Sequence, residues 1–209
     1  MKVGTKLGLG FAAVIAMLIV VAVVGITSMR TIQGELGDII NDKFPKTVWA
    51  NNMIDGINVI ARAMRNSLLE TDKEKVAKEL DRVVEARKVI TDNLEKLQGK
   101  IKSEEGKVVL AKVQEARSKY VDAQNAFITL VKEGKQEDAK VYILKDVRPL
   151  QTAYIDSISK LIEFQSNLMT KAGESADGQV QSSLTIIIII ALLAIVAGIV
   201  VALLIIRGL

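Results

Sequence analysis

The fold class is decided by residues 76–101, which read VAKELDRVVEARKVITDNLEKLQGKI. Apolar residues recur there at intervals of four and three, and charged residues fill most of the positions between them. This is the period of an amphipathic α-helix that buries one face against other helices. The buried face is expected to consist of Val76, Leu80, Val83, Arg87, Ile90, Leu94, Leu97 and Ile101.

Three further stretches carry the same period. One precedes this stretch and ends near Leu69, one covers about 109–130, and one follows Pro149. Four helices of this kind, joined by short connections, favour an all-α fold, an up-down-up-down four-helix bundle. We call the line of apolar residues on the buried face of each helix its seam. Arg87 interrupts the seam of the second bundle helix, over 76–101. Either a partner holds its charge, or the helix is rotated so that Val84 and Arg87 straddle the edge, which we favour.

Helix ends are indicated by residues that cap or break helices. Thr71 or Asp72 is expected to cap the second helix, and Ser103 the third. Gly99 is expected to stop the second helix, as a glycine just past a C-terminus often does. The third helix is expected to end at 132–134, with a short separate helix over 136–145.

The two prolines mark helix starts or bends. Pro45 should kink the first helix or start a fresh segment of it, because proline removes a backbone N–H and its ring crowds the preceding turn. Pro149 is expected at the entry of the last helix, where a missing N–H costs nothing.

Two uncharged runs of 23 residues, 7–29 and 184–206, flank the bundle. As helices, each would be about 34 Å long, enough for a hydrocarbon core of roughly 30 Å. The first run could instead be a signal peptide, but it exceeds the usual apolar core of one and no A-x-A site follows it. We therefore predict two transmembrane helices that flank the four-helix bundle.

Basic flanks set the expected orientation. Lys2 and Lys6 precede the first run, Arg207 follows the second, and no acidic residue lies on that side. The positive-inside rule then places both termini in the cytoplasm. The expected organisation is a cytoplasmic N-terminus over 1–6, transmembrane helices over 7–29 and 184–206, an external bundle over 30–183, and a further cytoplasmic segment that starts at 207–209.

Composition excludes several function classes. The chain has no Cys and no His, so catalytic mechanisms that use either residue are excluded. No phosphate-binding glycine motif and no calcium-loop spacing occurs. All 24 acidic residues and all but three of the 28 basic ones lie between the apolar runs, so the basic balance is a topology signal and not a nucleic-acid footprint. We expect no enzyme activity, no metal and no cofactor.

Three motifs in order carry a family resemblance: KLGLGF at 6–11, ARAMRNSLL at 61–69, and the spaced set Gly134, 137–139, 147–150 and Tyr154. On the basis of these three motifs, the chain resembles bacterial methyl-accepting chemotaxis proteins (chemoreceptors) that have a four-helix-bundle periplasmic sensor domain. The resemblance covers 1–209. Such receptors continue into a HAMP linker, which would begin at 207–209, and a cytoplasmic coiled coil. We therefore expect the N-terminal sensor-plus-transmembrane portion, or else a natural short protein.

The resemblance implies a multi-pass protein of the bacterial inner membrane with its sensor in the periplasm. It implies a homodimer, which can assemble into larger arrays, and a site for a small carboxylate or amino acid between helices one and four at the dimer interface. A shift of helix four would then reach a cytoplasmic chemotaxis kinase and coupling protein through the C-terminal part. The residues alone leave open whether the ligand site lies within one bundle or between two.

Candidate ligand-binding residues lie on the first and last bundle helices. Arg62 and Arg65 are one turn apart, and their guanidinium groups suit carboxylates. The alternative is that both are solvated surface arginines. The resemblance favours Arg65, Arg62 and Arg148, which precedes Pro149. Thr152 and Tyr154 follow one turn later, although Tyr154 also fits the apolar seam.

Three alternatives to direct chemotactic sensing stay open. The bundle could be the sensor module of a histidine kinase. It could also read a separate binding protein instead of a free ligand. A structural or adaptor membrane protein without a ligand is the third alternative.

Overall fold

The computed structural model describes residues 3–206, and within this range the chain is helical apart from three short connections and contains no strand. The predicted all-α fold is therefore confirmed. Residues 1–2 and 207–209 are outside the described residues, so the expected linker start and the extreme N-terminus are not seen. The elements in order are α1 (Val3–Asp38), the π-helix η1 (Ile39–Lys43), α2 (Phe44–Leu69), α3 (Lys73–Lys100), α4 (Glu104–Lys132), α5 (Gln136–Tyr142), the π-helix η2 (Ile143–Val147) and α6 (Arg148–Ile206).

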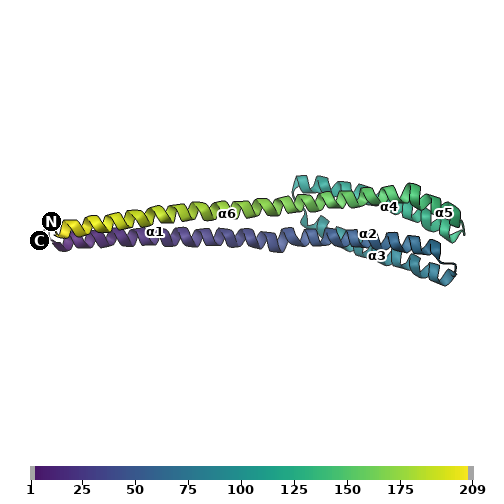
Figure 1. Cartoon of the computed structure of the whole chain (residues 1–209), viewed down its shortest axis with the longest axis horizontal. Helices are drawn as coiled ribbons and strands as arrows, with labels where there is room; N and C mark the ends of the chain where they lie inside the picture. The colour runs from purple at the N-terminus through teal and green to yellow at the C-terminus, as the bar shows by residue number, and fades with distance from the viewer. Residues whose placement is uncertain (1–2, 207–209) are drawn as a thin grey trace. The chain divides into compact units, whose positions relative to one another are not determined.

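The chain divides into two compact units. Residues 40–169 form the helical bundle from α2, α3, α4, α5 and the first part of α6. Residues 3–39 and 170–206 form a unit of two long apolar helices, α1 and the rest of α6, which lie side by side (Figure 1). This is the predicted bundle between two apolar segments.

The core of the bundle is the set of seams predicted from the sequence. Ile57, Val83, Val113 and Ile158 have no exposed surface and represent the four main helices. Each apolar side chain of this size contributes about 1.5–3 kcal/mol when it is fully buried. One contiguous cluster joins all four helices, so the amphipathic period of each helix is explained by burial against the others.

Two helix starts are capped as predicted. The Asp72 carboxylate accepts a hydrogen bond from the Glu74 amide at 2.8 Å, and the Ser103 hydroxyl accepts one from the Gly106 amide at 3.2 Å. Each bond satisfies a backbone donor that lacks a partner inside its helix. Helix α4 ends at Lys132 as expected, and Gly134 follows with a φ of +74°, which glycine adopts without strain.

The prediction that Gly99 stops the second bundle helix is wrong. Helix α3 continues through Gly99 to Lys100 and ends because Ile101 turns extended, with its side chain buried in the core. Burial of Ile101 thus decides the end of α3. Gly106 permits the close packing there, since a Cβ on it would lie 2.7 Å from Ile101 Cγ2.

Both prolines follow a five-residue π-helix. Pro45 lies in the first turn of α2 directly after η1, and Pro149 lies in the first turn of α6 directly after η2. A proline ring clashes with the carbonyl one α-turn before it, and a wider π turn relieves that clash. The expected separate helix over 136–145 is therefore wrong: α5 ends at Tyr142 and runs through η2 into α6 without a break.

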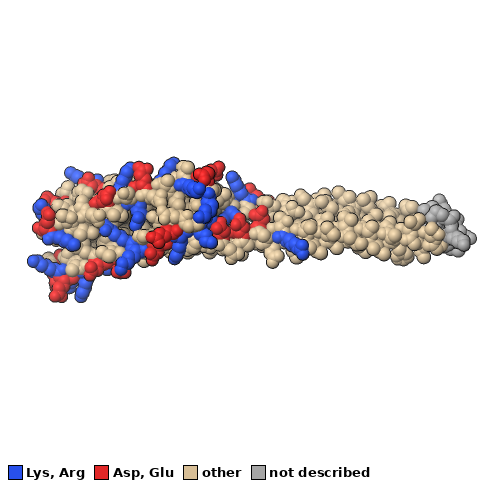
Figure 2. Space-filling model, turned by 180° about the vertical axis from the view of Figure 1, so that it is seen from behind, with Lys and Arg blue, Asp and Glu red and all other residues tan. Residues whose placement is uncertain are grey.

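The two-helix unit has the surface of a membrane-embedded pair. Both helices are long and apolar enough to cross a bilayer. Large apolar side chains such as Phe11 (63% exposed) and Ile195 (60%) face outward. On the face shown in Figure 2, charged side chains gather on the bundle and are sparse over the apolar helices. Lipid is the environment in which such exposed apolar surface is stable.

Candidate functional site

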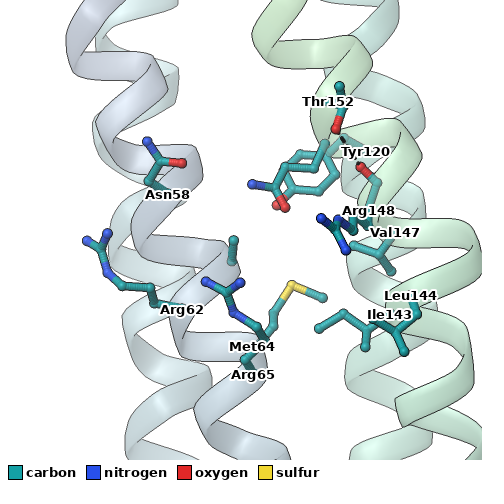
Figure 3. A pocket seen from close by; sticks show the side chains of 12 residues that line it. Asn58, Arg62, Met64, Arg65, Tyr120, Ile143, Leu144, Val147, Arg148 and Thr152 are labelled. Atoms are coloured by element: carbon teal, nitrogen blue, oxygen red, sulfur yellow. Dashed lines mark hydrogen bonds between the residues drawn. The ribbon is translucent and has the colours of Figure 1, made fainter.

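A cavity of about 420 Å³ opens within the bundle, which is a volume that suits a small molecule. Helices α2, α4 and α6 and the π-helix η2 all contribute to it (Figure 3). The lining residues are Asn58, Ala61, Arg62, Met64, Arg65, Tyr120, Ile143, Leu144, Val147, Arg148, Gln151 and Thr152.

Helix α2 supplies the arginines predicted from the sequence. Ala61 and Met64 are buried, which leaves Arg62 and Arg65 on the exposed side of the same helix. In Figure 3 the guanidinium group of Arg65 points into the space between α2 and α6, whereas the Arg62 side chain extends along the outer side of α2. Arg65 therefore faces the interior of the cavity and Arg62 its edge.

The start of α6 supplies the opposite wall. The Arg148 guanidinium points toward α2, and the Thr152 hydroxyl donates a hydrogen bond to the Arg148 carbonyl at 3.2 Å (Figure 3). Arg148 and Thr152 are four residues apart, so they share a helix face. The structure thus brings together four of the five predicted site residues around one cavity.

The cavity is electrostatically one-sided. Arg62, Arg65 and Arg148 line it, and no lining residue is acidic. Across the described part of the chain, none of these three arginines forms an ion pair. Three guanidinium groups without carboxylate partners attract an anion, and each can bind a carboxylate through two parallel hydrogen bonds.

Tyr154, the fifth predicted site residue, lies outside this cavity. Its side chain is 1% exposed and packs in the core, where its ring centroid is 6.0 Å from that of Tyr120. Burial raises the pKa of the Tyr154 hydroxyl. Its alternative interpretation as a seam residue therefore matches its position.

Tyr120 is a lining residue that the sequence did not single out. It occupies the apolar seam of α4, and its side chain is 1% exposed. Burial raises the pKa of its hydroxyl, although the Gln124 side chain and the nearby charges of Arg87 and Arg65 oppose the rise. The sequence signal that could have identified Tyr120 is its hydroxyl group, which is polar at a position where the seam of α4 is otherwise apolar.

A partly buried polar cluster lies beside Tyr120. Arg87 Nε donates to Gln124 Oε1 at 2.7 Å, and Arg117 donates to the Thr91 hydroxyl at 2.8 Å. Arg87 thus points inward while Val84 is 47% exposed, so the expectation that the two straddle the edge is wrong. Burial lowers the pKa of Arg87, and a second guanidinium nitrogen is buried without a partner.

The site offers no group of acidic or imidazole ligands for a metal. Within residues 3–206, no three acidic side chains come together in a way that would hold an ion. The polar groups that line the cavity are guanidinium, hydroxyl and amide groups.

A family model of the four helix bundle sensory module for signal transduction matches residues 1–180. The chain belongs to this family. The match covers the first apolar helix and the whole bundle, so the sensory module includes the arginine-lined cavity. It confirms the resemblance to chemotaxis receptors with a four-helix-bundle sensor. None of the curated proteins searched matches the chain.

Proposed function

We propose that this sensory module detects a small organic anion, such as a carboxylate or an amino acid, in the cavity between α2 and α6. The observation that supports it is the set of Arg62, Arg65 and Arg148 around one cavity that has no acidic residue. A carboxylate there would pair with guanidinium groups that form no ion pair with another described residue. One chain supplies all three arginines.

Ligand binding is tested by thermal unfolding of the full chain in lipid nanodiscs, followed by the fluorescence of its single tryptophan, Trp49. A panel of carboxylates and amino acids is compared. A ligand at about one hundred times its Kd adds about 2.7 kcal/mol to the unfolding free energy, which raises Tm by several degrees.

Variants assign the binding to the cavity. Arg65→Gln and Arg148→Gln should each abolish most of the ligand-dependent rise in Tm. Arg82→Gln is the matched control, because Arg82 is a partly exposed arginine of α3 that pairs with Glu79 away from the cavity. An unchanged response in both cavity variants would contradict the site. A panel with no response at all would favour the structural or adaptor alternative.

The signal is proposed to pass along α6. This single helix, Arg148–Ile206, carries Arg148, Gln151 and Thr152 of the cavity and also the second apolar run. A ligand that draws Arg148 toward α2 therefore acts on the helix that enters the membrane. We propose that a small shift of α6 reaches a cytoplasmic chemotaxis kinase and its coupling protein in a homodimeric receptor. A histidine kinase would be driven by the same movement.

The membrane topology belongs to the same proposal. We place the spans at 7–29 and 184–206, the bundle in the periplasm and both termini in the cytoplasm of a bacterial inner membrane. The two apolar helices of the structure support this arrangement. Because the chain has no cysteine, Lys75→Cys in the bundle gives one thiol. An impermeant maleimide should label it in intact spheroplasts, and labelling only after lysis would overturn the topology.

A further inference from the structure

The cavity has two chemically different walls. Arginine, amide and hydroxyl groups form one set, from Asn58, Arg62, Arg65, Arg148, Gln151 and Thr152. Apolar side chains form the other set, from Ala61, Met64, Ile143, Leu144 and Val147. A ligand that fills the cavity therefore meets cations and neutral polar groups on one side and hydrocarbon on the other.

An ammonium group has no suitable place in this lining. The acceptors that the lining side chains offer are neutral, from Asn58, Gln151, Thr152 and Tyr120. The carbonyl of Arg148 already accepts the Thr152 hydroxyl. An ammonium would therefore lose water without gaining a carboxylate, and three guanidinium charges would repel it.

The apolar wall favours a ligand with a hydrocarbon body. Met64 and Val147 are buried, and Leu144 is 62% exposed at the mouth. In Figure 3, Met64, Ile143 and Val147 approach one another beside the Arg65 guanidinium. A methylene or aromatic group placed there gains roughly 25 cal/mol for each Å² removed from water, whereas a second carboxylate gains nothing from this wall.

We propose that the cavity selects carboxylates that carry an apolar body and no ammonium group, in preference to amino acids with the same carbon skeleton. This selectivity rests on the proposed function, since it requires that the cavity binds an anion. The ligand class is then a branched-chain or aromatic monocarboxylate. Leu144 and Gln151 become specificity-determining residues.

Matched pairs of compounds test the selectivity by calorimetric titration of the full chain in nanodiscs, with empty nanodiscs as the blank. The pairs are 4-methylpentanoate with leucine, 3-phenylpropanoate with phenylalanine, and succinate with aspartate, which differ only by the ammonium group. Each amino acid should bind at least about tenfold more weakly than its partner, which corresponds to about 1.4 kcal/mol. Succinate should bind more weakly than the two apolar acids.

Two substitutions should change the selectivity without disturbing the core. Gln151→Glu places a carboxylate in the cavity and should reduce or reverse the preference against leucine. Gln114→Glu is the matched control, since Gln114 is exposed on α4 and outside the cavity lining. Leu144→Gln should weaken 4-methylpentanoate binding several-fold while succinate binding stays the same.

The possible results separate the two proposals. A preference for the acids that Gln151→Glu reduces supports the selectivity. Amino acids that bind as tightly as their partners, with binding lost in Arg65→Gln, would overturn the selectivity and leave anion sensing intact. If no compound of either class binds, the proposed function fails and the selectivity fails with it.

Discussion

Gly56 is the position where one added methyl group should be felt most clearly in the bundle. It is buried on α2 and faces α3, and a Cβ on it would lie 2.7 Å from Ile90 Cγ1 and 3.1 Å from Ile90 Cδ1. Ile90 is itself 3% exposed and has little room to move. Overpacking of this kind typically costs about 1–3 kcal/mol, while alanine gains about 1 kcal/mol over glycine in helix propensity. Gly56→Ala should therefore lower the unfolding free energy by about 1 kcal/mol.

Gly99 provides the matched comparison in the same fold. It lies inside α3, and nothing comes within 4 Å of a Cβ added to it. Gly99→Ala keeps the propensity gain without the overlap, so it should raise stability by about 0.5–1 kcal/mol. The same chemical change is thus expected to have opposite signs at two positions, with a difference of about 2 kcal/mol.

The assay is urea unfolding of the full chain in detergent, followed by the fluorescence of Trp49, which packs against the bundle core. A shifted midpoint with an unchanged slope reports a change in stability alone. Ile90→Ala removes the atoms that the new methyl group would meet, so Gly56→Ala should cost less in that background. If Gly56→Ala stabilises the wild-type chain as much as Gly99→Ala does, the close α2–α3 contact is refuted.

Three further predictions concern a cap, the pH and the apolar helices. Asp72→Ala should lower stability by about 1 kcal/mol, because the Glu74 amide loses its acceptor, and urea unfolding measures it. Above pH 10, Tyr120 and Tyr154 ionise in the unfolded chain but stay neutral in the folded protein, because burial raises the pKa of both hydroxyls. The unfolding free energy should therefore fall by up to about 1.4 kcal/mol per pH unit for each tyrosine. A variant with Phe at both positions should show a smaller fall. A Cβ on Gly10 would be 3.5 Å from Val201 Cβ, so Gly10→Cys with Val201→Cys should form an intrachain disulfide, and a failure to oxidise would contradict the pairing of the two helices.

Local signals in the sequence predicted the helices well. The four-and-three spacing over 76–101 matches the buried face of α3, and Asp72 and Ser103 cap the helices they precede. Periodicity and capping depend on neighbours within one turn, so they are readable without the fold. Gly99 failed as a stop signal because the tertiary burial of Ile101, a long-range effect, decides where α3 ends.

The arginines of the site were predictable, but the cavity was not. Helix spacing puts Arg62 and Arg65 on one face of α2, whereas the facing wall comes from residues more than fifty positions away. Spacing could have excluded Tyr154, which is six residues after Arg148 and so on another face of α6, next to Ile158 and Leu161 in the seam. Tyr120 could not be placed, because its seam position says only that it is buried.

The cavity wall that faces α2 is formed by η2 and the start of α6, and its shape depends on the π-helix η2, which precedes Pro149. Its lining residues recur as neighbouring pairs every four residues: 143 and 144, then 147 and 148, then 151 and 152. In a regular α-helix of 3.6 residues per turn, each pair would be rotated by about 40° from the one before, and the first and third would diverge by about 80°. A π turn takes up more residues per turn, so η2 offsets this rotation and keeps all three pairs on one face. The clash that the proline ring would cause in a regular helix thus explains why Leu144, Arg148 and Gln151 line the same cavity.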